Sequence, residues 1–98
     1  KFEREELPVP PPTAIESTLT ERGKRYGSFD GHAMITQMVK RSMDGHPGWL
    51  RLTDDQREAL EMIAHKIGRI INGDPNYADS WHDIAGYAKL VEDRLNKR

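Results

Sequence analysis

Apolar residues recur at helical spacing along the second half of the chain. Residues three and four positions apart share one side of a helix, so this pattern predicts a helix with a broad apolar stripe. The stripe consists of Leu60, Ile63, Ala64, Ile67, Ile70 and Ile71. Thr53 and Gln56 form a capping box at its start, and Asn72-Gly73 marks its end. We therefore expect a long helix with well-defined ends.

A further helix is predicted from about Tyr77 to Asp79 almost to the end of the sequence. Its apolar side holds Trp81, Ile84, Ala85, Ala88, Val91 and Leu95. The hinge Asn72-Gly73-Asp74-Pro75 lets these two helices form an antiparallel hairpin. Gly86 lies on the other side of the last helix, where a glycine costs about 0.5 to 1 kcal/mol relative to alanine. It predicts close approach of another backbone or a ligand.

The first half of the chain predicts two shorter helices. Thr13 and Glu16 form a capping box that opens a helix ending near Gly23, and a second helix runs from about Phe29 to Met43. Residues 1–12 end in a proline-rich run, which favours an extended arm. The sequence thus predicts an all-α fold, with an arm over residues 1–12 and one bundle of about four helices over residues 13–98.

Composition suggests that this bundle has a thin core. Of 98 residues, 36% are hydrophobic and 32% are charged, so we expect a homo-oligomer, with dimerisation completing the core. The net charge of −1, from 16 acids and 15 bases, gives no global field toward nucleic acid. No apolar run reaches the roughly 20 residues that span a bilayer. The absence of cysteine fits a reducing compartment, and we expect a cytoplasmic protein without a membrane partner.

Four acidic residues form two helical pairs, Glu58 with Glu61 and Asp79 with Asp83. Each pair shares a helix face, and the hairpin could bring the two faces together. Carboxylate oxygens are the ligands that Mg²⁺ prefers, so these residues are candidates for a magnesium site. The alternative is a solvated helix face with no metal.

A basic, glycine-containing segment lies between the first two predicted helices. Residues 22–29 contain two glycines, three bases, a hydroxyl and two aromatic rings, which could surround a phosphate and stack on a base. The spacing matches neither a P-loop nor a dinucleotide-binding fingerprint. The alternative is a helix cap whose rings fill the core and whose bases are solvated.

Residues 52–95 resemble a family of small uncharacterised phage and prophage proteins. The resemblance is carried by Glu58 to Glu61, His65 to Arg69, Asn72 to Tyr77 and Asp79 to Tyr87, and Glu21 to Phe29 fits it too. More distantly, Glu-x-x-Glu followed by an acidic pair on the next helix is similar to the MazG-type all-α nucleoside triphosphate pyrophosphohydrolases. Ser80 stands where that superfamily usually has a glutamate, and Asp79 is one residue away.

The MazG-type resemblance implies a specific chemistry. The acids of that superfamily bind magnesium and the triphosphate, and water attacks a phosphorus to release pyrophosphate and the monophosphate. By position, the implied catalytic residues are Glu58, Glu61 and Asp83, and Asp79 joins them as a metal ligand. Candidate phosphate or base contacts are Arg22, Lys24, Arg25, Tyr26, Lys66 and Arg69.

Three functional hypotheses follow. The first is a phage-type, MazG-like protein that binds a nucleotide with magnesium and hydrolyses it, in the cytoplasm of the host cell. The second is a non-catalytic accessory protein that sequesters a nucleotide or binds a host protein. The third is a structural module whose acidic stripes are only solvated. Nucleic acid is the least favoured partner, because the one basic cluster is small.

Overall fold

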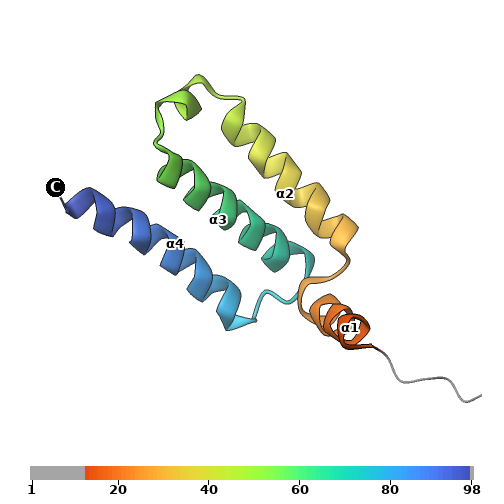
Figure 1. Cartoon of the computed structure of the whole chain (residues 1–98). Coiled ribbons are helices and arrows are strands. Elements are labelled where there is room, and N and C mark those ends of the chain that lie inside the picture. The colour runs from red at the N-terminus through yellow and green to blue at the C-terminus, as the bar shows by residue number, and fades with distance from the viewer. Residues whose placement is uncertain (1–12, 98) are drawn as a thin grey trace, which may run out of the picture.

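The computed structural model describes residues 13–97, and this part of the chain is built from helices with no strand (Figure 1). The all-α prediction is therefore confirmed, whereas the predicted arm over residues 1–12 lies outside the described residues. The elements are α1 (Ala14–Tyr26), α2 (Phe29–Asp44), the 3₁₀ helix η2 (Pro47–Arg51), α3 (Asp54–Asn72) and α4 (Ala78–Asn96). No described helix is both long enough and apolar enough to cross a bilayer.

Helix α3 is the central element of a single layer. Helices α2 and α4 pack against its two sides, each running antiparallel to it, and α1 lies across one end of the layer (Figure 1). The helices α2 and α4 share no extensive contact with each other. Each residue of α3 that faces neither neighbour therefore lies on one of the two broad sides of the layer.

The ends of the helices agree with the sequence except at the end of α1. The Thr13 backbone N–H donates to Glu16 Oε1 at 2.9 Å, and the Glu16 N–H donates to Thr13 Oγ1 at 3.1 Å, so the first capping box is confirmed. The prediction that this helix ends near Gly23 is wrong. It continues to Tyr26, because the left-handed conformation that ends it occurs at Gly27, with φ of 77°.

The core of the described chain is very small. Its buried apolar residues are Ala59, Ala64 and Ile70, and no large side chain is fully buried. Three polar residues are also buried, namely His32, Thr36 and Ser80. Small residues at the contacts bring the backbones close together, but they remove little apolar surface from water.

Gly68 sets the distance between α2 and α3. A Cβ atom at this position would overlap with Thr36 Oγ1 and would lie 2.6 Å from His32 Cδ2. Gly86 on α4 differs, because a Cβ atom there would have no neighbouring atom within 4 Å. No backbone of the described chain approaches Gly86, and the close approach between two helices falls at Gly68 instead.

Asn72 at the end of α3 fastens the turn between α1 and α2. Its Nδ2 donates to the Tyr26 carbonyl at 2.7 Å and to the Ser28 carbonyl at 2.8 Å. The backbone N–H of Asp74 also donates to the Arg25 carbonyl at 2.5 Å. A side chain at Gly27 or at Gly73 would collide with the opposite backbone, so glycine is needed at both positions. We call this contact the Asn72 clamp.

Replacing Gly68 and Gly86 by alanine should have opposite effects on stability. The Gly68→Ala variant should lower the free energy of unfolding by about 1–3 kcal/mol, because the new methyl group overpacks the contact with α2. The Gly86→Ala variant should raise it by about 0.5–1 kcal/mol, since alanine favours the helix and the site is open. Urea denaturation of both variants measures the difference. Equal effects of the two substitutions would contradict this account of Gly68.

Removing the Asn72 amide should also destabilise the protein. The Asn72→Ala variant loses both donated hydrogen bonds, at an expected cost of about 1–3 kcal/mol and a drop in Tm of roughly 5–15 °C. Thermal unfolding followed by circular dichroism measures this change. Asn76→Ala, at an exposed position of the next loop, is the matched control and should stay near the wild-type Tm.

Candidate functional site

The largest concave region among the described pockets lies where α1, α2 and α3 meet. It encloses about 600 Å³, within the range of small-molecule sites. It is lined by Leu19, Arg22, Gly23, Tyr26, Gly27, Ser28, Phe29, His32, His65 and Arg69. We call it the α1–α3 groove. The Asn72 clamp holds its floor in place, because the clamp bonds the backbone at Tyr26 and Ser28.

The α1–α3 groove is positively charged. Two guanidinium groups, from Arg22 and Arg69, belong to its lining, and no acidic residue does. The Arg69 guanidinium lies 4.1 Å from the centroid of the Tyr26 ring, a cation–π contact that orients the arginine without neutralising it. Ser28 and Phe29 place the groove at the N-terminus of α2, where the helix dipole favours an anion.

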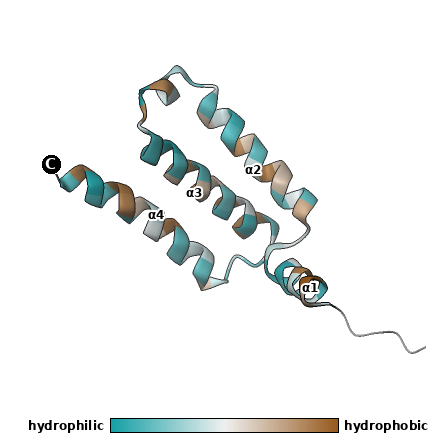
Figure 2. Cartoon of the chain, viewed as in Figure 1, coloured by the Kyte–Doolittle hydropathy of each residue, from teal (hydrophilic) through white to brown (hydrophobic). Residues whose placement is uncertain are grey.

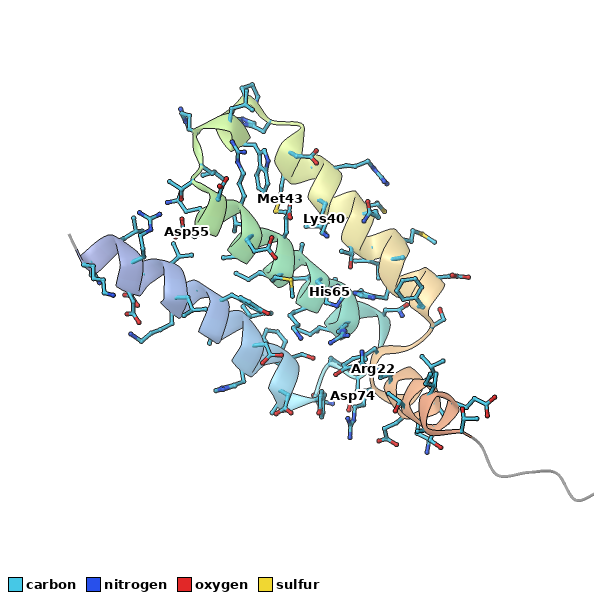
Figure 3. The ribbon with its side chains drawn as sticks, in the orientation of Figure 1. Arg22, Lys40, Met43, Asp55, His65 and Asp74 are labelled. Atoms are coloured by element: carbon cyan, nitrogen blue, oxygen red, sulfur yellow. The ribbon has the colours of Figure 1, made fainter. Side chains whose placement is uncertain are left out.

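Two histidines of the groove lining, His32 on α2 and His65 on α3, form a wall between these helices. Figure 3 labels His65 on the side of α3 that faces α2. The Nε2–H of buried His32 donates to the His65 carbonyl at 3.0 Å, and the Nε2 atom must carry the proton because a carbonyl only accepts. The two rings meet edge to face with centroids 4.4 Å apart. Burial, followed by repulsion from Arg69, His32, Lys66 and Lys40, lowers the pKa of His65 to about 4. A neutral His65 ring at pH 7 thus lies in a positive field.

Only part of the predicted basic set reaches this groove. Arg22, Tyr26 and Arg69 belong to its lining, whereas Lys24 and Arg25 do not. Arg25 instead pairs with Glu21 at 3.2 Å and lies 4.8 Å from the centre of the Tyr77 ring. Its interactions support the turn after α3.

Lys66 lies between α3 and α4. Its Nζ pairs with Asp83 Oδ2 at 2.8 Å, and this contact lowers the pKa of the Asp83 carboxyl. Because Lys66 precedes Arg69 by three residues on α3, the two cations are neighbours on the helix surface. Arg69, Lys66 and Asp83 therefore form a row of charged side chains. This row leads from the α1–α3 groove to the contact between α3 and α4, which we call the α3–α4 seam.

Two of the four predicted acids, Glu58 and Asp83, line hollows along this seam. Asp83 lines a hollow of about 370 Å³ together with Tyr87 and Leu90, and Glu58 lines one of about 210 Å³ that shares these same two residues. Glu58 and Asp83 thus belong to one side of the helical layer. Asp79 accepts a hydrogen bond from the Tyr77 hydroxyl at 3.0 Å. Glu61 lines neither hollow.

Within residues 13–97, no three histidine or acidic side chains gather in an arrangement that could hold a metal ion. Glu58 and Asp83 are the predicted metal ligands that share one surface, with Tyr87 between them. The Lys66 ammonium neutralises Asp83 in this arrangement.

The histidine wall and the role of Asn72 do not follow from the sequence patterns. His32 lies on an amphipathic helix, and helical spacing pairs His65 with Glu61, yet the two histidine rings contact each other. The Asn72-Gly73 pattern predicts only a helix end. The glycines at positions 27, 31 and 73 are a usable signal, since each of them leaves room for Asn72 or for the chain next to it.

The fold and the groove together define a small all-α protein with a single helical layer and a cationic pocket at one end. A family model described as a domain of unknown function (DUF6378) matches residues 12–95, and the chain belongs to this family. The searches of curated proteins and of solved structures gave no match.

The lowered pKa of His65 predicts a pH dependence of stability. Between pH 6.5 and about pH 4 the unfolded chain binds a proton at His65 and the folded chain does not, so stability should fall as the pH falls through this window. Solvent screening of the partly exposed ring limits the loss to about 1 kcal/mol.

Urea denaturation at pH 7, 6, 5 and 4 measures this dependence. The His65→Gln variant should show a flatter slope over that range, because glutamine does not titrate. The control His82→Gln removes an exposed imidazole from α4 and should keep the wild-type slope. An unchanged slope in His65→Gln would contradict the assignment.

Proposed function

We propose that this protein binds a nucleotide, with its phosphates in the α1–α3 groove. The observation that supports this most directly is the pair Arg22 and Arg69 in a pocket whose lining holds no carboxylate. Among the described residues, neither arginine belongs to an ion pair. An anionic ligand is the chemistry that such a pair recognises, because guanidinium groups bind phosphate oxygens through two parallel hydrogen bonds.

The remaining lining residues fit the other parts of a nucleotide. Ser28 offers a hydroxyl, and the turn at Gly27 offers backbone close to the ligand. Phe29 is 77% exposed at the edge of the groove, where its ring meets His32 edge to face and is accessible for stacking on a base. A volume of about 600 Å³ accommodates a ligand of this size.

Magnesium-dependent hydrolysis of a nucleoside triphosphate is the second candidate function. It is favoured by the position of Lys66, which links the groove to Asp83, and by Glu58 on the same side of the layer. A triphosphate extending from Arg69 along α3 would reach Lys66 and could draw it away from Asp83. Magnesium would then bind Asp83 and phosphate oxygens, since this ion needs only one or two protein carboxylates besides the substrate.

Binding is tested with calorimetry on a panel of nucleoside mono-, di- and triphosphates, with and without magnesium. Arg69→Gln and Arg22→Gln should each weaken binding about 10- to 100-fold, because each removes a charged hydrogen-bonding group from the phosphate. Lys24→Gln is the matched control on α1 and should bind as the wild type does, since Lys24 lies outside the groove lining. Binding that survives both arginine substitutions would exclude the groove as the site.

Turnover is tested separately by pyrophosphate release. If the second candidate is correct, Glu58→Gln and Asp83→Asn should abolish release while nucleotide binding in the groove remains. Binding without any release in the wild type would identify a protein that holds its nucleotide intact.

A further inference from the structure

The two broad sides of the helical layer differ in chemistry. One side carries the hollows with Glu58 and Asp83 and continues into the groove at His65 and Arg69, and we call it the charged side. The other side of α3 carries Leu60 and Ile63, followed at helical spacing by Ile67 and Ile71. We call this the apolar side.

The neighbouring helices extend the apolar side in both directions. On α2, His32 and Thr36 contact α3 and Phe29 lines the groove, so Ile35, Met38 and Val39 fall on the opposite flank. On α4 the corresponding residues are Trp81, Ala85, Ala88 and Leu95. Bands of hydrophobic and hydrophilic colour alternate along all three helices in Figure 2, as they do when one side of a helix is apolar.

Much of this apolar surface is open to solvent. Met38 is 56% exposed, Ile71 66% and Trp81 55%. A hollow of about 340 Å³ lies on this side between α3 and α4, and its lining contains no charged residue. Its lining residues are Leu52, Gln56, Ala59, Leu60, Ile63, Ala88 and Val91. Soluble domains bury such a surface against a second layer of secondary structure, which this chain does not supply from its described residues.

We propose that the apolar side is a homodimer interface, in which the same side of a second copy supplies the missing layer. The two layers would be related by a twofold axis, so that each copy presents the same patch to the other. The α1–α3 groove and the charged side then remain in solvent, and this proposal stands without the proposed nucleotide function.

The size of the apolar side matches a stable dimer. Helices of 19 residues, such as α3 and α4, are about 28 Å long, and packed helices lie about 8–10 Å apart. A layer three helices wide therefore has a footprint of about 750 Å². A standard protein interface buries about 800 Å² on each partner, so one face-to-face contact suffices.

A second copy also fits better than an unrelated partner. The apolar side is continuous with the chain's own core, because Ile63 lies beside buried Ala59 and Ile67 precedes buried Gly68. Covering the apolar side therefore contributes to folding of the chain itself. A second copy of the chain is a partner that is present wherever the protein is made. In a dimer, the uncharged hollow of one copy faces that of the other, and no unpaired charge is buried. An acidic or basic partner would bury its charges against this hollow without counter-ions.

The first test is the mass of the full chain in solution by light scattering after gel filtration. We expect twice the 11.2 kDa of one chain at micromolar concentration, and a Tm that rises with protein concentration. A monomer with a concentration-independent Tm would overturn the proposal. The same result is expected if the apolar side binds a different protein, so this alternative is also excluded by finding a dimer.

The second test compares two apolar residues on opposite sides of the layer. Leu60→Glu on the apolar side should raise the dimer dissociation constant at least about 100-fold or leave the chain unfolded, because it buries a charge in the interface. Leu90→Glu, at a 66% exposed position on the charged side, should remain a folded dimer. In a folded monomer, Leu60 is 39% exposed and the same substitution would be tolerated.

A third measurement does not depend on folding of the glutamate variants. The chain has no cysteine, so Leu60→Cys and Leu90→Cys each introduce one thiol. In the proposed dimer, a thiol reagent should label position 90 at least about 10-fold faster than position 60, because burial blocks access to the thiol. Equal labelling rates, or protection at position 90, would overturn the assignment of the interface.

Discussion

The contact between Asn72 and the turn after α1 holds the end of α1 and the start of α2 against the end of α3. Its amide reaches two carbonyls, of Tyr26 and Ser28, that lie 46 and 44 residues away in the sequence. These bonds matter for α1 because α1 buries no residue of its own, and the Asp74 N–H bond to the Arg25 carbonyl adds to them. The same two bonds fix the floor of the α1–α3 groove. One side chain therefore serves both the fold and the candidate site, and the three surrounding glycines let it approach.

Helices α2 to α4 are predictable because their determinants are local. Capping residues, apolar spacing and the Asn72-Gly73 stop lie within a few positions of the feature that they specify, so the sequence predicts α3 and α4 closely. The end of α1 is harder to predict from the sequence, because either Gly23 or Gly27 could end the helix. Only the tertiary contact with Asn72 selects Gly27. The contact between His32 and His65 is even harder to predict from the sequence. It requires the rotation of α2 against α3, which periodicity does not specify.

The candidate site shows the same division between local and distant information. Basic residues near a glycine turn predict a place for phosphate, and Arg22, Tyr26 and Arg69 do line one groove. The spacing of the acids predicts shared helix faces, yet the relative height of α3 and α4 sets Asp83 opposite Lys66. Helical register along a hairpin depends on the length and shape of its turn, and no pattern within either helix records it.

Helix α1 is the least buried element and also one wall of the groove. Any ligand held between Arg22 and Arg69 would tie this helix to α3 and add to what the Asn72 clamp already supplies. The energy of ligand binding and the energy of docking α1 are then linked, and each must strengthen the other by the same amount. Ligand binding in the α1–α3 groove would therefore increase the order of α1 at the amino-terminal end of the domain. A neighbouring segment or protein that contacts α1 would then bind differently to the ligand-bound and ligand-free forms.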